Sequence, residues 1–249
     1  MEAGKLDANR DFGTPRKAVD FMNGSFGAPP TIPMPTFPDA ALGAVVIAQP
    51  HERVVARVGI YYGDLAARTL RGSGGVFAVS SAVWRWRFVG DAPLGYVGLG
   101  AWHHSGVFTN TNPTGMVPQR GGRDQGVYVI GGDRIAYLSS DARALGWLAR
   151  AGIVPSHDVP VSAFAGVGLL LRSLGDPWRY TAGIGASLVR LPAEFNKIPA
   201  DASEVAVEAF VKLPVHGSVA LQPDVQYVVS PSGIFPDALA VALRLLVWL

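Results

Sequence analysis

The feature that most constrains this chain is a strict alternation of apolar and polar residues between positions 203 and 213. One set of alternate positions holds Val205, Val207, Ala209, Val211 and Leu213, and the charges Glu204, Glu208 and Lys212 all fall in the other set. Successive side chains of a β-strand point to opposite faces, whereas a helix would mix the two sets. The segment is therefore predicted to be a strand with one apolar and one polar face.

The same alternation resumes after a short turn at positions 214–217. Valine, leucine and tyrosine again occupy one face, and Gln222, Asp224 and Gln226 occupy the other. Two such segments joined by so short a link predict an antiparallel hairpin.

Period two recurs along the chain, with Arg57, Arg85 and Arg87 each alternating against apolar neighbours. Because no segment shows a convincing helical period, we predict an all-β protein. Its segments of about 9–13 residues suit a tilted transmembrane strand of roughly 9–11 residues better than an average strand of roughly 5–6. We expect twelve strands, starting near Lys5, Ala41, Arg53, Gly75, Leu94, Gln125, Leu145, Asp158, Arg179, Ser203, Ser218 and Asp237.

Composition narrows the choice of protein class. Hydrophobic residues make up 49% of the 249 residues and charged residues only 16%, against roughly 25% charged in an average soluble domain. The longest uncharged apolar stretch, 159–171, is shorter than the ~20 residues of a membrane-spanning helix. A net charge of +2 with no dense Lys/Arg run argues against a nucleic-acid partner.

The apolar face of the predicted strands is long and unbroken, while the opposite face mixes charges with small residues and phenylalanine. This arrangement is typical of a membrane β-barrel with an apolar outside and a polar lumen. An ordinary β-sandwich or soluble barrel remains an alternative on this evidence.

Link lengths favour the membrane barrel, because such barrels have short turns at one rim and long loops at the other. Short links at 49–52, 90–93 and 214–217 alternate with long links at 9–39, 63–74, 105–124 and 191–202. The links at 154–157 and 173–178 break this rule.

Several motifs resemble the carbohydrate-selective porins of the OprB type. The resemblance rests on Trp102–Phe108 (WHHSGVF), Gly126–Val129 (GVYV), Gly4–Asn9 (GKLDAN), Asn23–Gly27 (NGSFG) and Leu221–Tyr227 (LQPDVQY). It implies an antiparallel outer-membrane β-barrel that admits sugars by passive diffusion. It also implies a single domain over residues 1–249. Members of this family form 16-stranded barrels, so the chain is N-terminally short relative to them. Its strands could be part of such a larger barrel. The terminal Leu249 departs from the aromatic residue that usually ends such proteins.

This reading places outer-membrane lipid and sugars among the partners, with a homo-oligomer or a partner chain that completes the barrel as a further possibility. The alternatives are a non-conducting truncated barrel that serves as a structural subunit, and a soluble all-β carbohydrate-binding module. In a sugar pore, charged and amide side chains replace water on the hydroxyls and aromatic faces contact the rings. The expected pore-lining residues are Arg57, Arg85, Arg87, Trp102, Glu204, Glu208, Lys212, Gln222, Asp224 and Gln226.

The sequence lacks the residue patterns that a metal site or a hydrolase would need. His103 and His104 are consecutive and so point to opposite faces of a strand, which does not suit one metal ion. The chain has no Cys and no G-x-S-x-G nucleophile elbow. We therefore expect no enzyme activity, no metal and no cofactor. The first five residues carry no signal-peptide pattern.

Overall fold

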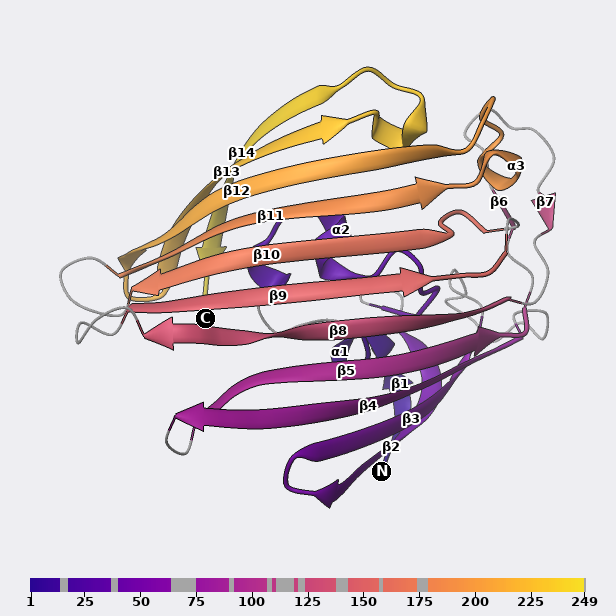
Figure 1. The fold of residues 1–249 in the computed structure, drawn as a ribbon, viewed down its shortest axis with the longest axis horizontal. Helices are drawn as coiled ribbons and strands as arrows, with labels where there is room; N and C mark the ends of the chain where they lie inside the picture. Colours follow the sequence, from indigo (N-terminus) through magenta and orange to yellow (C-terminus); the bar gives the residue numbers. More distant parts are fainter. Residues whose placement is uncertain are drawn as a thin grey trace.

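A computed structural model describes residues 1–13, 18–36, 40–63, 75–89, 92–106, 109–110, 119–120, 124–137, 143–156, 159–173 and 179–248. Twelve antiparallel strands form one strongly curved sheet in which neighbours follow the order of the sequence (Figure 1). The strands of this sheet are β1 (Glu2–Leu6), β2 (Ala41–His51), β3 (Val54–Tyr62), β4 (Val76–Val89), β5 (Ala92–His104), β8 (Asp124–Tyr137), β9 (Arg143–Ile153), β10 (Ala163–Ser173), β11 (Tyr180–Leu191), β12 (Ala202–His216), β13 (Val219–Val229) and β14 (Ala238–Val247). Two further strands, β6 (Thr109–Asn110) and β7 (Gln119–Arg120), pair only with each other.

The all-β antiparallel class predicted from the alternation is confirmed, and so are the positions of most strands. The largest difference is β10, which begins at Ala163 rather than near Asp158. Pro160 lies in the intervening stretch, and proline has no N–H to donate to a sheet ladder. The strand accordingly begins beyond it, where Ala163 pairs with Ile153 on one side and Arg190 on the other.

The expectation of no helix was wrong, although the helices are short. The described residues include α1 (Ala8–Asp11), α2 (Gly24–Gly27), α3 (Ala193–Asn196) and the 3₁₀ turns η1 (Ala18–Asp20) and η2 (Pro231–Gly233). A single turn is too short to show the 3.6-residue period on which prediction depends. No helix in the described residues has the length and apolarity needed to cross a membrane.

The two faces of the sheet differ in the way the alternation predicts. On the neighbouring strands β12 and β13, Val207 and Val225 are 39% and 45% exposed, whereas Glu208 and Asp224 are 0% and 1% exposed. The apolar side chains thus form the convex outer surface, and the polar side chains point to the concave side. An apolar exterior of this kind suits hydrocarbon as solvent.

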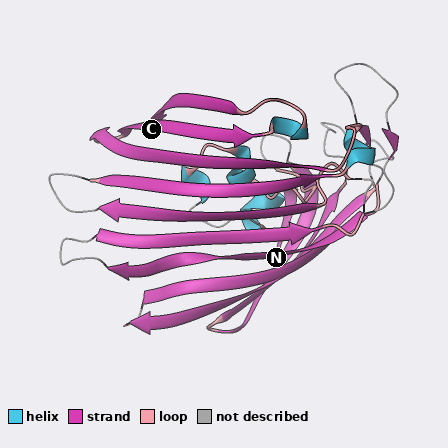
Figure 2. Ribbon diagram, turned by 45° about the horizontal axis from the view of Figure 1, so that its top comes forward, coloured by secondary structure: helices cyan, strands magenta, loops and turns pink. Residues whose placement is uncertain are grey.

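The concave side of the sheet holds the core of the molecule. Figures 1 and 2 show α1 and α2 lying inside the curve of the sheet, behind the wall formed by β8 to β11. Buried side chains from this inner region pack on the inner wall in separate clusters, one of which includes Phe12 and Tyr61 and another Phe21 and Phe210.

The sheet ends in two edge strands. In the part of the chain that the structure describes, β1 pairs only with β2, and β14 pairs only with β13. Each edge therefore carries a row of backbone N–H and C=O groups directed away from its one partner.

This arrangement predicts a specific cross-linking pattern. With no native Cys, Ala3→Cys combined with Ala44→Cys should be bridged efficiently by a short bifunctional thiol reagent, because these residues are opposite each other in β1 and β2. Ala3→Cys combined with Val241→Cys on β14 should not be bridged within one chain, as read by mobility on a denaturing gel. Efficient intramolecular bridging of the second pair would mean that the twelve strands close on themselves.

Candidate functional site

The long link between β1 and β2 folds into the concave side of the sheet rather than standing above its rim. We call the described residues 7–13 and 18–35 of this link the inward segment. Its aromatic side chains are buried: Phe12, Phe21 and Phe26 are 1%, 4% and 0% exposed. They fit against glycines of the inner wall, since a Cβ added at Gly59 would lie 3.0 Å from the Phe12 ring, and one added at Gly185 would lie 2.7 Å from the Phe26 ring. The wall is thus shaped to receive this segment.

An aromatic cluster joins the inward segment to β12. Phe21 stacks on Phe26 with ring centroids 4.3 Å apart and meets Phe210 edge-on at 5.1 Å. Offset-stacked and edge-to-face contacts each add about 0.5–1.5 kcal/mol beyond the burial of apolar area. The cluster therefore fixes the middle of the inward segment against the wall.

Glu208 provides the main polar anchor. One carboxylate oxygen accepts the backbone N–H of Met22 at 2.6 Å and the other accepts that of Asn23 at 2.8 Å. Because Glu208 is 0% exposed, it cannot rely on bulk water, and a buried carboxylate is costly unless it is hydrogen-bonded. The two N–H donors satisfy this need and tie the inward segment to β12.

Side chains around Glu208 extend this anchor. Lys212 forms an ion pair with Asp20, and Gln222 donates from its amide to the backbone carbonyl of Asp20 at 2.8 Å. Asn23 donates from its side-chain amide to Oε1 of Gln226 at 3.3 Å. Strands β12 and β13 therefore hold the inward segment through several side chains in addition to Glu208.

A second anchor comes from β9. The guanidinium of Arg150, 3% exposed, donates to the backbone carbonyl of Ser25 and lies 5.1 Å from the centre of the Phe164 ring. This position combines a charge-assisted hydrogen bond with a cation–π contact. The inward segment is therefore held from two separated parts of the wall.

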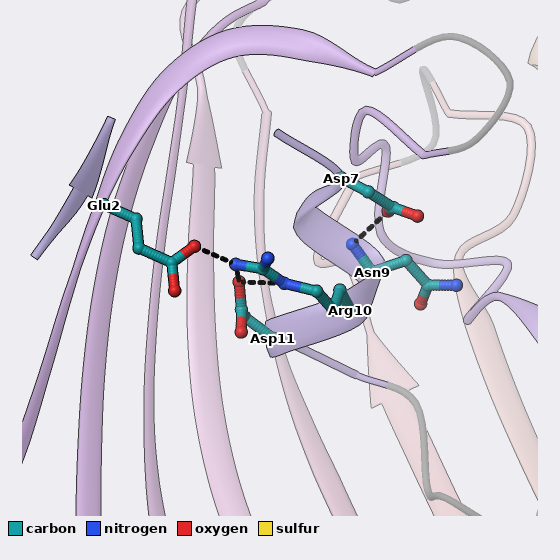
Figure 3. A network of polar contacts seen from close by, with 5 residues as sticks. All are labelled: Glu2, Asp7, Asn9, Arg10 and Asp11. Carbon is teal, nitrogen blue, oxygen red and sulfur yellow. Dashed lines mark hydrogen bonds and ion pairs between the residues drawn. The ribbon is translucent and has the colours of Figure 1, made fainter. Parts of the chain in front are cut away.

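The inward segment also has its own local order. The side chains of Asp7 and Asn23 accept backbone N–H groups at the starts of α1 and α2, both at 2.9 Å, as expected of N-cap residues. Figure 3 shows Arg10 of α1 between Asp11 at 2.8 Å and Glu2 of β1 at 2.5 Å. Hydrogen bonds to Asp11 and then Glu2 raise the pKa of the Arg10 guanidinium above its usual range.

Half of the residues expected to line a pore are brought together around this anchor. These are Glu208, Lys212, Gln222, Asp224 and Gln226. Asp224 accepts the side-chain amide of Gln226 at 3.0 Å, and its Oδ2 has no hydrogen-bond donor among the described residues. In this structure the group supports the inward segment, and its contact with sugar remains a prediction.

The other expected residues lie elsewhere on the wall. Glu204 accepts the backbone N–H of Ser232 in η2 at 2.7 Å, near the end of β13. Arg57 on β3 and Arg85 on β4 fall on the inner face of neighbouring strands, with Arg57 opposite Ser81 in the register. Arg87 belongs to β4, but its side chain lies outside the described residues. Trp102 on β5 is 4% exposed, with its ring 6.3 Å from that of Phe77.

Sequence reasoning identified the link at 9–39 as a long loop but missed that it folds inward, and with it the roles of Asp20 and Arg150. A signal was present, because the link contains large apolar residues at Phe12, Phe21 and Phe26. Such side chains are unfavourable in a water-exposed loop. Their burial inside the sheet explains why they occur there.

The described residues contain no group of three or more His, Asp or Glu side chains that could hold a metal ion. The interior instead offers carboxylate, amide and guanidinium groups on an aromatic and glycine-lined wall. These groups can donate and accept hydrogen bonds.

Comparison with known proteins decides the family. The family model for carbohydrate-selective porins of the OprB family matches residues 1–248. The chain belongs to the OprB family. Porins of this family are proteins of the bacterial outer membrane, and the sheet described above is accordingly part of a transmembrane β-barrel.

A solved structure agrees with this assignment at the level of the fold. The high-pH structure of Pseudomonas putida OprB matches with a TM-score of 0.81 at 20% sequence identity, covering 98% of this chain and 68% of that one. No curated protein matches the sequence. The OprB resemblance inferred from the motifs is thus confirmed.

Because Glu208 holds the inward segment, the substitution Glu208→Gln should loosen that segment locally. This change removes the charge and one of the two carboxylate acceptors for Met22 and Asn23, and a hydrogen bond to a charged group is worth about 1.5–3 kcal/mol. We expect hydrogen exchange at the Met22 and Asn23 amides to accelerate by about 10- to 100-fold. Glu204→Gln, which affects only the η2 contact among the hydrogen bonds described, is the matched control. Equal exchange in wild type and Glu208→Gln would show that Glu208 does not hold the segment.

Proposed function

We propose that this chain forms the wall of an outer-membrane pore through which sugars diffuse passively, with residues 1–249 acting as one domain. The proposal includes no catalytic step, because the polar groups of the interior bind and support rather than form a nucleophile and base pair. The membership of the OprB family supports sugars as the permeating molecules.

The observation that carries this proposal is the reversal of polarity across a single layer of strands. Glu208 and Asp224 point inward and are fully buried, whereas Val207 and Val225 one residue away point outward and are exposed. A soluble sandwich would bury the valines and expose the charges. A polar lumen inside an apolar exterior requires lipid outside and water or polar solute inside.

The inward segment is proposed to be the fixed constriction of this pore. It occupies the concave side of the sheet, and its contacts with Glu208, Gln222 and Arg150 are made by buried groups. Such contacts favour a segment that stays in place while solute passes beside it. The residues then proposed to meet sugar are Arg57, Arg85 and Arg87 on β3 and β4, together with Trp102 on β5, which packs in one cluster with Ile32 and Met34 of the inward segment.

We further propose that strands from outside these 249 residues complete the barrel wall. Edges such as those of β1 and β14 are not tolerated when exposed to hydrocarbon, because each unpaired backbone group costs several kcal/mol. Further strands from the same protein or from a partner chain would satisfy them. The part of Pseudomonas putida OprB not covered by this chain, 32% by difference from the 68% covered, is consistent with additional strands.

The conductance of the pore tests the proposed role of the arginines. Replacing Arg85 and Arg87 together by Gln removes two positive charges from one stretch of β4, so ion preference should shift toward cations and sugar should block the current less strongly. Single-channel recordings in planar bilayers under a salt gradient measure the first effect, and titration with sugar measures the second.

The matched control is Arg190→Gln. Arg190 is exposed and lies 3.7 Å from Asp201 near the strand end, so its loss should leave both readings unchanged. An unchanged reversal potential in the Arg85 and Arg87 double variant would place these arginines away from the ion path. Absence of any conductance in the assembled wild-type barrel would instead support the non-conducting structural subunit.

A further inference from the structure

Glu208 and Asp224 form a pair of buried acidic side chains on the inner wall. Asp224 lies opposite Phe210 in the β12–β13 register, two residues along from Glu208, and therefore on the same face. The two side chains are 0% and 1% exposed, and their carboxyl groups share a side-chain hydrogen bond. Two carboxylates in one buried site cannot both stay ionised unless a cation compensates them.

The hydrogen bonds that lead to this pair have a fixed direction. Asn23 accepts the backbone N–H of Ser25 on its side-chain oxygen at 2.9 Å, and its amide nitrogen donates to Gln226 at 3.3 Å. Gln226 then donates its own amide nitrogen to Oδ1 of Asp224 at 3.0 Å. Because a side-chain amide has one donating and one accepting end, this chain of contacts makes Oδ1 of Asp224 an acceptor.

Three of the four oxygens in the pair have an N–H donor. Both oxygens of Glu208 accept backbone N–H groups of the inward segment, and Oδ1 of Asp224 accepts the amide of Gln226. The fourth, Oδ2 of Asp224, is buried and has no donor among the described residues. A proton on this oxygen would give it a hydrogen bond to make, as buried polar atoms normally have.

The charged groups on the same side of the sheet are directed at other partners. Lys212, four residues from Glu208 on β12, pairs with Asp20 of the inward segment, and Arg172 of β10 lies 3.9 Å from the same carboxylate. Glu204, four residues from Glu208 in the other direction, accepts a backbone N–H of η2. These contacts leave the Glu208 carboxylate without an ion pair among the described residues.

The strands on either side of the pair place no charge directly opposite it. Gly185 of β11 is opposite Glu208, and Ala242 of β14 is opposite Asp224. Arg244, the cation of β14, is opposite Gln222 and forms no ion pair among the described residues. A proton therefore accounts for the burial of two adjacent carboxyl groups better than a cation does.

We propose that Asp224 is held as the neutral acid, with its proton on Oδ2 and donated to Glu208. This hydrogen bond fixes the Glu208 carboxylate where it accepts the two N–H groups of the inward segment. Asp224 thus acts through Glu208 and is a positioning residue. The inference rests on the proposed constriction and explains how its anchor is held. It also gives the motif at 221–227 a physical role, because Gln222 and Gln226 of that motif hold Asp20 and orient Asp224.

Loss of this proton to water should weaken the hold on the inward segment, because it leaves two adjacent buried anions. When the segment leaves the wall, both carboxyl groups meet water and ionise above about pH 4, as exposed carboxyl groups do. The attached segment therefore binds one proton more than the detached one. Raising the pH from about 5 to about 9 should favour detachment, by up to about tenfold for each pH unit over which the attached state keeps its proton.

Infrared difference spectroscopy tests the proton directly. The C=O stretch of a protonated carboxyl group is separated from that of a carboxylate, so the folded protein in detergent micelles is compared with Asp224→Asn at neutral pH. We expect a protonated-carboxyl band in the wild type that is absent from the variant. Isotope-labelled aspartate should shift this band and isotope-labelled glutamate should not, a measurement that requires only the wild-type protein.

Hydrogen exchange measures the consequence for the inward segment. After correction for the intrinsic exchange rate, protection of the Met22 and Asn23 amides in the wild type should fall as the pH rises from about 5 to about 9. Asp224→Asn keeps a donor but cannot ionise, so its protection should equal that of the wild type at about pH 5 and stay constant. Asp224→Ala has no donor and should exchange about tenfold faster throughout.

Asp237→Asn is the matched control. Asp237 is exposed and accepts the hydroxyl of Tyr227 at 2.8 Å and the backbone N–H of Ser230 at 3.1 Å. Replacing it makes the same chemical change in the link between β13 and β14, away from the inward segment. Both the infrared band and the exchange profile of Met22 and Asn23 should remain as in the wild type.

The outcomes separate this inference from the proposed pore. It is overturned if the wild type lacks the protonated-carboxyl band, if labelled glutamate shifts that band, or if Asp224→Asn keeps the pH dependence. Failure of Asp224→Asn to fold or to protect the segment would also overturn it, because an ionised Asp224 paired with a cation such as Arg244 would then be required. A protonated Asp224 in a protein that does not conduct would support the inference and contradict the pore.

Discussion

The structure depends on one constraint, which is that backbone polar groups inside a lipid bilayer must be paired within the protein. Strands that hydrogen-bond to their neighbours in sequence order satisfy this requirement. Because side chains alternate along a strand, the same strands also determine which residues face lipid. The outward valines of β12 and β13 and the inward Glu208 and Asp224 are consequences of this single layer. Among the described residues, β1 and β14 each have one unpaired edge, and the same constraint is the reason for our proposal that further strands complete the wall.

A polar interior creates a second problem, because charges pointing inward must be solvated or paired. Here part of that solvation is provided by the chain itself: Glu208 accepts backbone N–H groups of the inward segment, and Lys212 pairs with Asp20. Breaking a buried ionic contact by removing one partner is strongly destabilising. The same contacts that satisfy the wall therefore determine where the inward segment lies on the concave side of the sheet.

The strands were predictable from the sequence because their alternation is long and covers nearly every strand, as at positions 203–227. The inward direction of Glu208, Gln222 and Asp224 followed from the same pattern. Their partners did not, since Met22 and Asn23 lie about 185 residues away along the chain and contribute backbone groups that leave no mark in composition. Single-turn helices such as α2 were missed because their caps, not their periodicity, define them.

The most direct test of this account is to fix the inward segment to the wall and measure conduction. Asn23 and Gln226 are in contact in the structure, so Asn23→Cys combined with Gln226→Cys allows a covalent bridge between the segment and β13. If the segment is a fixed constriction, single-channel conductance should be the same before and after bridging, and the same again after reduction. A large, reversible fall in conductance on bridging would show that the segment must leave the wall for solute to pass, and would contradict the account.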